Sequence, residues 1–506
     1  MKTIQKALEN KLSPYLILLA AVIFLIVLLS LVHPGIFFSG DGGLKYLILK
    51  QFNQSGEFRH IISTHPEWVE KTWQQGYYPF QPPFVYEIEN EHMITFPVFF
   101  GFLSSFCYGQ FGYYGIYIIP ALSVLLTWVI FLGVLTELKI KIGTKALGLF
   151  LLAFCTPLTF YGAVFWEHSL ATFLLFNAFI YFIRERAKVL PAFLSGLLAG
   201  MAIWFREETI ALLGLVIATI AWNNRKFRSR PDIFFIIGTI IPVLLCFLFN
   251  NIVFGSIFGL HGQQIVGESN VVTQLLKGSK QFLRLNLYQL IYFPCIGVFY
   301  FILFSLWKKR KENFHKLFQI ALVVLLFTLI VPFLLPSAGD KQWGPRFFLP
   351  VVPPVILVIT IFADKNNWLE LLQRNKGWTI LFTLFLVYGV YMNVYRAGKE
   401  LKHDYSQRVY PILKYIDVHP CPNIIVDHQY VAQELTEKFN SKNFFLLSSE
   451  AGLPALLLSL KSAGQQQCIF ISINKEKTSF PDTITKNKNI EWKPVGNYMV
   501  GLFDIP

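Results

Sequence analysis

Residues 14–33 read PYLILLAAVIFLIVLLSLVH, an apolar run that contains no Asp, Glu, Lys or Arg. As an α-helix, about 20 such residues cross the hydrocarbon core of a bilayer. Lysines precede the run, as they do in a signal peptide, but the run is too long for a signal-peptide core. The sequence His33-Pro34-Gly35 is also not a small-residue cleavage site. We therefore expect a retained helix that anchors the chain in a membrane.

Ten further apolar runs follow the first one. The chain has 506 residues, of which 54% are hydrophobic and 15% are charged, whereas soluble domains carry about 25% charged residues. This composition excludes an average cytosolic enzyme and predicts an α-helical polytopic membrane protein with about eleven transmembrane helices. The ten runs are 112–136, 146–163, 169–183, 189–205, 209–222, 233–252, 286–306, 317–335, 347–363 and 377–395.

The net charge of +14 would suggest a nucleic-acid partner if the protein were soluble. Here the Lys and Arg residues gather in every second loop between the runs, and loops of this kind are retained in the cytoplasm. The alternation predicts an integral protein of the plasma membrane (the inner membrane of a bacterium), with a cytoplasmic N-terminus, membrane lipid around it and no nucleic-acid partner. The basic loops are 139–145, 184–188, 225–230, 308–316 and 365–376.

The tail, residues 396–506, is long enough for a small domain on the outer side. It alternates apolar strands with helical stretches, and Gly496-Asn497 between two apolar segments is typical of a two-residue hairpin turn. We therefore expect a small C-terminal α/β domain outside the membrane. Its expected strands are 423–426, 443–447 and 468–471, and its expected helices are 429–439 and 451–462.

The domain organisation expected from these patterns has two parts. Residues 1–395 form the transmembrane domain, which includes a long outward segment at 35–92. Residues 396–506 form the extracytoplasmic domain. Cys421 and Cys468 both lie in that domain, where a disulfide is permitted, and the sequence leaves their pairing open.

Polar residues collect where the apolar runs meet the outer surface. Each ionisable group costs a few kcal/mol if it enters hydrocarbon, so its presence needs a reason. Just beyond the first run, Ser39-Gly40-Asp41-Gly42-Gly43 precedes an apolar stretch suited to a helix at the membrane surface. Asp41 either caps that helix or acts there as a general base or a metal ligand.

A second polar turn, Phe165-Trp166-Glu167-His168-Ser169, lies between two apolar runs. Glu167 and His168 beside aromatic rings can orient a sugar or transfer a proton. The alternative is a plain helix start, where the helix dipole favours an acid. We take Asp41 and Glu167 as rival catalytic carboxylates and His168 as a substrate-binding candidate.

Two more outward turns carry basic residues against the topological bias. In Trp204-Phe205-Arg206-Glu207-Glu208 the charges either neutralise one another, or Arg206 binds a phosphate with its two parallel donors. The stretch 337–350 either begins a helix with proline in its first turn or binds an anionic head group such as a lipid phosphate or pyrophosphate. The substrate-binding candidates from these turns are Arg206, Glu207, Lys341, Trp343 and Arg346.

Metal binding has little support in the sequence. His60, His65 and His261 lie in outward segments without the spacing of a metal-binding pair, and the cysteines form no CxxC motif. We expect no metal site from these residues, and a requirement for a divalent cation stays open.

These features together resemble the GT-C polytopic glycosyltransferases, which include the protein O-mannosyltransferases, the aminoarabinose transferases and bacterial transferases of lipopolysaccharide cores. The resemblance rests on an aspartate shortly after the first run, a long first outward loop and polar turns on one face. The turn 165–169 and the stretch 343–350 are similar to segments common in bacterial members. The resemblance covers about 35–395 and does not include the tail.

The resemblance implies a sugar donor carried by polyprenyl phosphate, and transfer with inversion to a hydroxyl of a glycan, lipid or protein acceptor on the outer face. The first-loop acid of the family corresponds to Asp41, which takes the proton of the acceptor. Arg346, Lys341 and Arg206 are the candidates for holding the leaving phosphate. Many members have a second acid close to the first. This chain lacks it, which keeps Glu167 as a rival base.

Two other functions remain as alternatives. A transporter or lipid flippase tends to have repeats, broken helices and ionisable residues at mid-membrane, whereas these runs are almost free of charge and show no repeat. An O-antigen ligase or polymerase would also use outward Arg and His residues on a large loop. The sequence favours the glycosyltransferase.

Overall fold

The structure is a computed structural model of the chain, and its contacts divide the chain into two compact units. Unit 1 comprises Met1–Ser30 and Tyr117–Lys399, and unit 2 comprises Leu31–Ile116 and Glu400–Pro506. Unit 2 therefore holds the first outward segment together with most of the tail. The described residues are 10–56, 65–88, 91–184, 188–223, 229–260, 271–308, 314–335, 337–339, 341–473 and 491–505.

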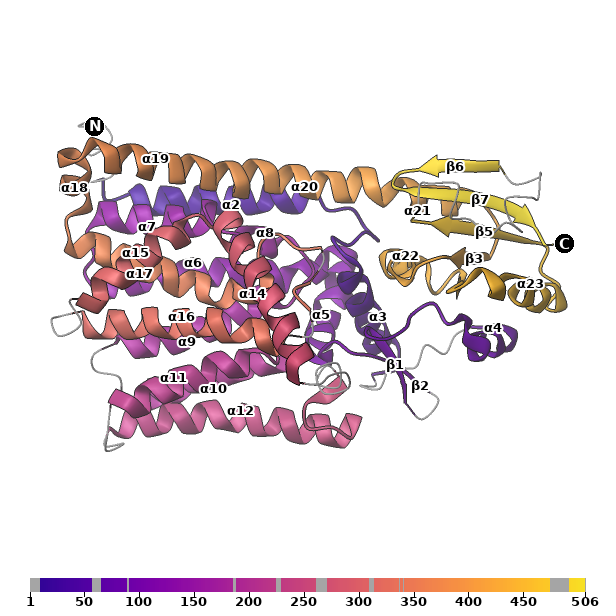
Figure 1. Cartoon of the computed structure of the whole chain (residues 1–506), viewed down its shortest axis with the longest axis horizontal. Helices are drawn as coiled ribbons and strands as arrows, with labels where there is room; N and C mark the ends of the chain where they lie inside the picture. Colours follow the sequence, from indigo (N-terminus) through magenta and orange to yellow (C-terminus); the bar gives the residue numbers. More distant parts are fainter. Residues whose placement is uncertain are drawn as a thin grey trace. The chain divides into compact units, whose positions relative to one another are not determined.

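Unit 1 is a bundle of helices, most of which run roughly parallel to one another (Figure 1). Their side chains are apolar around much of the helix, as expected where hydrocarbon replaces water on the outside. The helices are α2 Ser13–Ser30, α6 Ile118–Glu137, α7 Ile142–Phe154, α8 Leu158–Gly162, α9 His168–Ile183, α10 Val189–Met201, α11 Thr209–Asn223, α12 Arg230–Phe254, α14 Val271–Tyr292, α15 Cys295–Lys308, α16 His315–Leu334, α17 Val352–Lys365, α18 Trp368–Arg374 and α19 Lys376–Val390.

The described part of the chain contains six helices long and apolar enough to cross a membrane, or up to seven if a bent pair counts as one span. Shorter apolar helices, among them α7, α9, α10 and α11, coincide with further runs expected from the sequence. The predicted class, a polytopic α-helical membrane protein with a small C-terminal sheet domain, is confirmed. The number of about eleven spans stays a prediction.

The run 286–306 does not form one straight helix. α14 ends at Tyr292, α15 begins at Cys295, and the two helices meet at an angle of 106°. The break falls at Phe293-Pro294, where proline has no N–H to donate and its ring disfavours a helical residue before it. The span predicted at 286–306 was therefore wrong at its start, and Pro294 within the run was the local signal for the bend.

Helices α10 and α12 approach each other closely through glycines. A Cβ atom added at Gly196 would lie 2.1 Å from the carbonyl oxygen of Phe235, and one added at Gly200 would lie 2.4 Å from that of Thr239. Such small residues let two backbones touch, which is how helices commonly associate in a membrane.

The Gly196→Ala variant is expected to lower stability. Overpacking costs about 1–3 kcal/mol, which exceeds the roughly 1 kcal/mol that alanine gains over glycine in a helix. Gly214→Ala in α11 is the matched control, because a Cβ atom there meets nothing within 4 Å. Thermal unfolding in detergent should give a lower Tm for the first variant only. Equal Tm values for the two variants would contradict the close packing.

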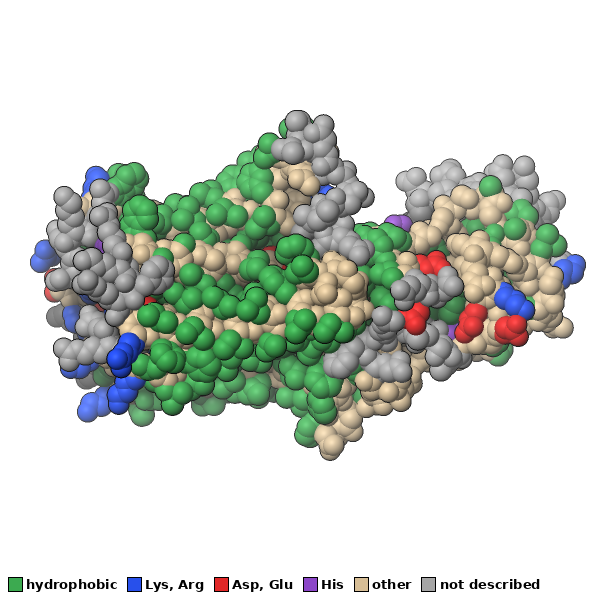
Figure 2. Space-filling model, turned by 90° about the horizontal axis from the view of Figure 1, so that it is seen from below, with side chains coloured by type: hydrophobic (Ala, Val, Ile, Leu, Met, Phe, Trp, Pro, Cys, Tyr) green, Lys and Arg blue, Asp and Glu red, His purple; other side chains and the backbone are tan. Residues whose placement is uncertain are grey.

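The basic loops of unit 1 meet at one end of the bundle. Arg184 pairs with Glu137 at 3.0 Å, Lys316 donates to the carbonyl of Arg184 at 2.9 Å, and the backbone N–H of Lys141 donates to Asp364 at 3.0 Å. Figure 2 shows Lys and Arg side chains at this end and hydrophobic side chains along the flank of the helices. An apolar flank of this extent needs a membrane around it. Which end faces the cytoplasm stays a prediction.

Unit 2 combines the first outward segment with a small sheet domain. From the first segment come α3 Gly40–Ser55, α4 Glu67–Thr72, β1 Val85–Ile88, β2 Glu91–Ile94 and α5 Val98–Phe111. From the tail come the last four residues of α20 Ala397–His403, and α21 Tyr410–Val418, β3 Asn423–Val426, α22 Gln429–Glu434, β4 Asn443–Leu446, α23 Leu453–Ser462, β5 Gln467–Ser472, β6 Glu491–Val495 and β7 Tyr498–Asp504.

The sheet of the tail has the strand order β4-β3-β5-β7-β6. β3 runs parallel to β4 and to β5, whereas β7 is antiparallel to both β5 and β6. The expected hairpin is present, with Val495 opposite Tyr498 and with Gly496 at φ +61° in the turn. Cys421 and Cys468 are both free thiols in this structure.

The first outward segment packs on this sheet domain. The indole N–H of Trp73 donates to the carbonyl of Phe444 in β4 at 2.8 Å, and the hydroxyl of Tyr77 donates to the carbonyl of Gly452 at 2.8 Å. Sequence patterns did not reveal these contacts, because more than 370 residues separate the partners.

Candidate active site

Two of the candidate residues lie together at the start of α9. Glu167 immediately precedes the helix and His168 is its first residue, and their side chains are only 1% and 2% exposed. Nδ1 of His168 lies 3.9 Å from Oε1 of Glu167. The imidazole ring is 5.3 Å from the ring of Trp166 and 5.9 Å from that of Tyr161. The turn therefore buries a carboxylate and an imidazole among aromatic rings.

Arg206 reaches the same carboxylate from the turn between α10 and α11. Its NH1 atom lies 3.0 Å from Oε1 of Glu167, and its NH2 atom lies 2.6 Å from Oε1 of Glu208. Burial by itself lowers the pKa of Arg206, but Glu208 and Glu167 outweigh this effect and raise the pKa. The guanidinium stays charged. One guanidinium therefore pairs with two carboxylates.

Arg346 approaches this group from the 3₁₀ turn Arg346–Val351 that leads into α17. Its guanidinium carbon lies 4.7 Å from the ring centre of Trp166 and 5.2 Å from that of Phe347. The guanidinium carbon of Arg206 lies 5.1 Å from the same Phe347 ring. Phe347 thus contacts two cations, and aromatic faces attract cations because of their quadrupole. We call Glu167, His168, Arg206, Glu208 and Arg346 the charged cluster.

Glycines in the loop before Arg346 allow this approach. Gly339 adopts φ +77°, and a Cβ atom there would lie 3.2 Å from both Nε and NH2 of Arg346. Gly344 adopts φ +71° and lies against the side chain of Tyr292. Only glycine takes up such positive φ values at little cost. The glycines of this loop therefore let the chain turn and let the guanidinium pack against its backbone.

Trp343 lies in a different environment from Arg346. It is buried, its N–H donates to Oδ1 of Asn393 at 3.3 Å, and its ring stacks on Phe160 at 5.2 Å and meets Tyr292 edge-on at 4.9 Å. These contacts connect the loop to the helices around it. A role of Trp343 in binding substrate stays a prediction.

The ion pairs of Arg206 are with Glu167 and Glu208 and do not include Glu207 or Lys341. The carboxylate of Glu207 points toward Gly259, where a Cβ atom would lie 3.4 Å from Oε1. Burial raises the pKa of Glu207 above its ordinary value, as does the neighbouring Glu208. Lys341 is half-buried in the bend that precedes Trp343. Their predicted roles in substrate binding stay predictions.

Asp41 belongs to unit 2 and lies in the first turn of α3. The capping residue of that helix is Ser39, so Asp41 itself is not the cap. A carboxylate in the first turn is still favoured by the helix dipole. The side chain of Asp41 is half-buried. This placement agrees with an acid held at a defined point on a rigid element.

Three members of the site were missed by sequence reasoning. Glu208 stood in the quoted motif but was not chosen over Glu207, although it is the one that pairs with Arg206. Trp166 and Phe347 provide the aromatic faces for the two guanidiniums. Their position directly beside Glu167 and Arg346 in the sequence was the available signal.

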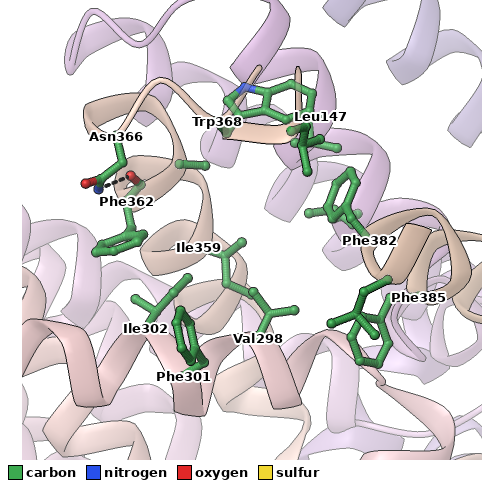
Figure 3. Close-up of a pocket in the computed structure, with 14 residues that line it drawn as sticks. Leu147, Val298, Phe301, Ile302, Ile359, Phe362, Asn366, Trp368, Phe382 and Phe385 are labelled. Atoms are coloured by element: carbon green, nitrogen blue, oxygen red, sulfur yellow. Dashed lines mark hydrogen bonds between the residues drawn. The ribbon is translucent and has the colours of Figure 1, made fainter. Parts of the chain in front are cut away.

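A separate apolar pocket of about 150 Å³ opens between other helices of unit 1 (Figure 3). Its lining side chains come from α7, α15, α17, α18 and α19 and from the α17–α18 connection. Asn366 is the one polar side chain among the described lining residues, and it donates to the carbonyl of Phe362 at 2.8 Å. The pocket suits a hydrocarbon segment and offers no charged group for a phosphate.

The described residues contain no group of three His, Cys, Asp or Glu side chains that could hold a metal ion. His65 packs edge-on against Trp73 at 4.8 Å and Phe439 at 5.2 Å. Burial lowers the pKa of His65, which favours its neutral form. His60 and His261 lie outside the described residues.

Comparison with solved structures gives a match over nearly the whole chain. The crystal structure of ArnT from Cupriavidus metallidurans bound to undecaprenyl phosphate is 14% identical, with a TM-score of 0.57, and the match covers 96% of this chain and 97% of that one. The apo structure of the same protein is 13% identical, with a TM-score of 0.56. No protein-family model matches the sequence, and no curated protein matches it. The chain therefore has the fold of ArnT, an aminoarabinose transferase of the GT-C type, as the resemblance in its sequence implied.

Proposed function

We propose that this protein is a membrane glycosyltransferase that moves a sugar from a polyprenyl-phosphate carrier to a hydroxyl acceptor on the outer face of the membrane. The observation that carries the proposal is the charged cluster, because it places a half-buried arginine beside aromatic faces at one end of an apolar bundle. A polyprenyl tail stays in hydrocarbon, so its phosphate lies near the membrane surface, at the depth expected for such a turn. The ArnT fold, solved elsewhere with undecaprenyl phosphate, supports this reading.

The geometry favours Arg346 over Arg206 as the group that holds the leaving phosphate. Arg206 is only 7% exposed, and its guanidinium is engaged by two carboxylates. Arg346 lies against the rings of Trp166 and Phe347 and is half-buried. A guanidinium offers two parallel donors to a phosphate. Lys341, which is half-buried in the same loop five residues before Arg346, is the candidate second cation.

Asp41 is the better of the two candidate bases. Glu167 is 1% exposed, and its Oε1 is held by Arg206. An acceptor hydroxyl must come within hydrogen-bond reach of its base, and such burial keeps the acceptor away. Asp41 is half-buried at the start of a helix. Glu167 therefore acts by fixing Arg206, and Asp41 acts on the acceptor.

The proposed reaction is a single displacement with inversion. The acceptor oxygen attacks the anomeric carbon, its proton passes to the carboxylate of Asp41, and the bond between that carbon and the phosphate oxygen breaks. The phosphate leaves with the electron pair, and Arg346 stabilises the charge that develops on it. Attack from the side opposite the leaving phosphate inverts the anomeric configuration.

The direct test is sugar transfer by purified protein in lipid. A panel of radiolabelled polyprenyl-phosphate sugars is offered with envelope glycolipid as acceptor, once with Mg²⁺ or Mn²⁺ and once with EDTA. Wild-type protein should transfer or hydrolyse at least one donor, and Asp41→Asn should lose this activity while keeping its Tm. If no donor reacts, and Asp41→Asn leaves the cellular glycans unchanged, the proposal fails.

A further inference from the structure

Helix α3, which carries Asp41, packs on helix α22 of the tail at distances that only glycine permits. A Cβ atom at Gly43 would lie 1.9 Å from the carbonyl oxygen of Gln433 and 2.7 Å from Oγ1 of Thr436. A Cβ atom at Gly40 would lie 2.5 Å from Oε1 of Gln433. The first turn of α3 therefore touches α22 directly, on either side of Asp41 in the sequence.

An arginine whose side chain is 12% exposed joins the same two segments. Arg408 donates to Oδ1 of Asp404 at 2.9 Å, to Oε1 of Glu434 at the end of α22, and to the carbonyl of Phe38 at 3.4 Å, just before α3. Burial by itself lowers the pKa of Arg408, but Glu434, Tyr498 and Asp404 raise it, so the guanidinium stays charged. One side chain thus holds the end of α22 and the chain that enters α3.

Gln433 is not the residue that packing alone would select. Its side chain is fully buried, and neither of its amide atoms has a hydrogen-bond partner among the described residues. An unsatisfied buried amide lowers stability, whereas an apolar side chain of the same shape does not. The amide oxygen nevertheless lies against Gly40, one residue before Asp41. Because the buried amide of Gln433 lowers stability, its presence points to a role other than stability.

We infer that the tail positions the catalytic base: α22, through Gln433 and with Arg408 behind it, fixes the start of α3 and thereby Asp41. The inference rests on the proposed function, in which Asp41 takes the proton of the acceptor. Gln433 and Arg408 are positioning residues, since they act through α3. A displacement of about 1 Å at a reacting group can slow a reaction by about 100-fold, so this contact has a measurable effect on rate.

The test uses two separate variants, Gln433→Met and Gly43→Ala. Gly109→Ala in α5 is the control. A Cβ atom at Gly109 would make only an ordinary contact, 3.6 Å from Oδ1 of Asn53. Gln433→Met should keep or raise the Tm, because it removes the unsatisfied amide. The kcat should fall at least about tenfold, because a flexible thioether replaces the planar amide that packs against Gly40. KM for the polyprenyl-phosphate sugar should stay within about twofold, since the donor site is untouched.

Hydrogen exchange gives a readout that does not depend on activity. In Gly43→Ala the amides of α3 should exchange at least about tenfold faster than in wild type, and in Gly109→Ala they should not. If Gly43→Ala does not fold, Arg408→Gln replaces it, and Arg408→Lys should restore part of the protection because it keeps the charge.

The outcomes separate the two ideas. If wild-type protein transfers sugar and Gln433→Met keeps the wild-type kcat, the positioning role is overturned. The same holds if α3 exchanges at the wild-type rate in Gly43→Ala, or in Arg408→Gln where that variant replaces it. If Gly43→Ala exposes α3 but the wild-type protein reacts with no donor, the packing is upheld, and the proposed function falls together with the role of Asp41.

Discussion

Replacing Arg346 with alanine is expected to lower kcat/KM for sugar transfer by about 10²–10³-fold, the loss seen when one donor that stabilises a developing negative charge is removed. The reason is that Arg346 is the half-buried guanidinium of the charged cluster, against Trp166 and Phe347. Arg346→Lys should recover only part of the rate, because lysine keeps the charge but loses the two parallel donors. Initial rates with a labelled polyprenyl-phosphate sugar measure both effects.

Arg374→Ala is the control for this prediction. Arg374 lies in α18, its side chain is 83% exposed, and its distance to Glu370 is 3.9 Å. Its removal should change neither rate nor Tm, because exposed pairs of this kind contribute about 0–1 kcal/mol. A wild-type rate for Arg346→Ala, or an equal loss in both variants, would remove Arg346 from the donor site.

Replacing Arg206 with methionine is expected to destabilise the protein by about 3–5 kcal/mol, because it leaves the carboxylates of Glu167 and Glu208 buried without their common cation. Glu167→Gln should cost less, since Glu208 still compensates Arg206. The free energy of unfolding, measured by titration with SDS, gives both values.

The exposed pair of Arg184 and Glu137 supplies the matched control. Its side chains are 39% and 52% exposed, so Arg184→Met should cost no more than about 1 kcal/mol. If Arg206→Met is as stable as Arg184→Met but has lost donor binding, then Arg206 is a phosphate ligand, and its pairing with the carboxylates is not what holds the turns together.

Local patterns in the sequence predicted the tail well. The strands β3, β4 and β5 and the hairpin at Gly496-Asn497 all lie within a residue or two of their expected places. Their signals are local, because apolar alternation and turn residues act over a few neighbours. The alternation of basic and polar loops likewise predicted which turns would share an end of unit 1.

Contacts between distant residues were not predictable in the same way. Glu167 and Arg206 pair across 39 positions, and the choice of Glu208 over Glu207 as second partner depends on how the turn between α10 and α11 is folded. The packing of Trp73 on Phe444 joins segments that the sequence had assigned to separate domains. Each of these depends on tertiary packing, which a single sequence does not display.

In the proposed reaction a polyprenyl phosphate leaves as the sugar moves, and counting the two products of one turnover tests this step directly. Wild-type protein loaded with a labelled polyprenyl-phosphate sugar should release one polyprenyl phosphate for each sugar that reaches the acceptor, with the anomeric configuration inverted. Asp41→Asn should release neither. Transfer from a nucleotide sugar without any lipid carrier, or release of polyprenyl phosphate that Asp41→Asn leaves unchanged, would contradict the proposed reaction.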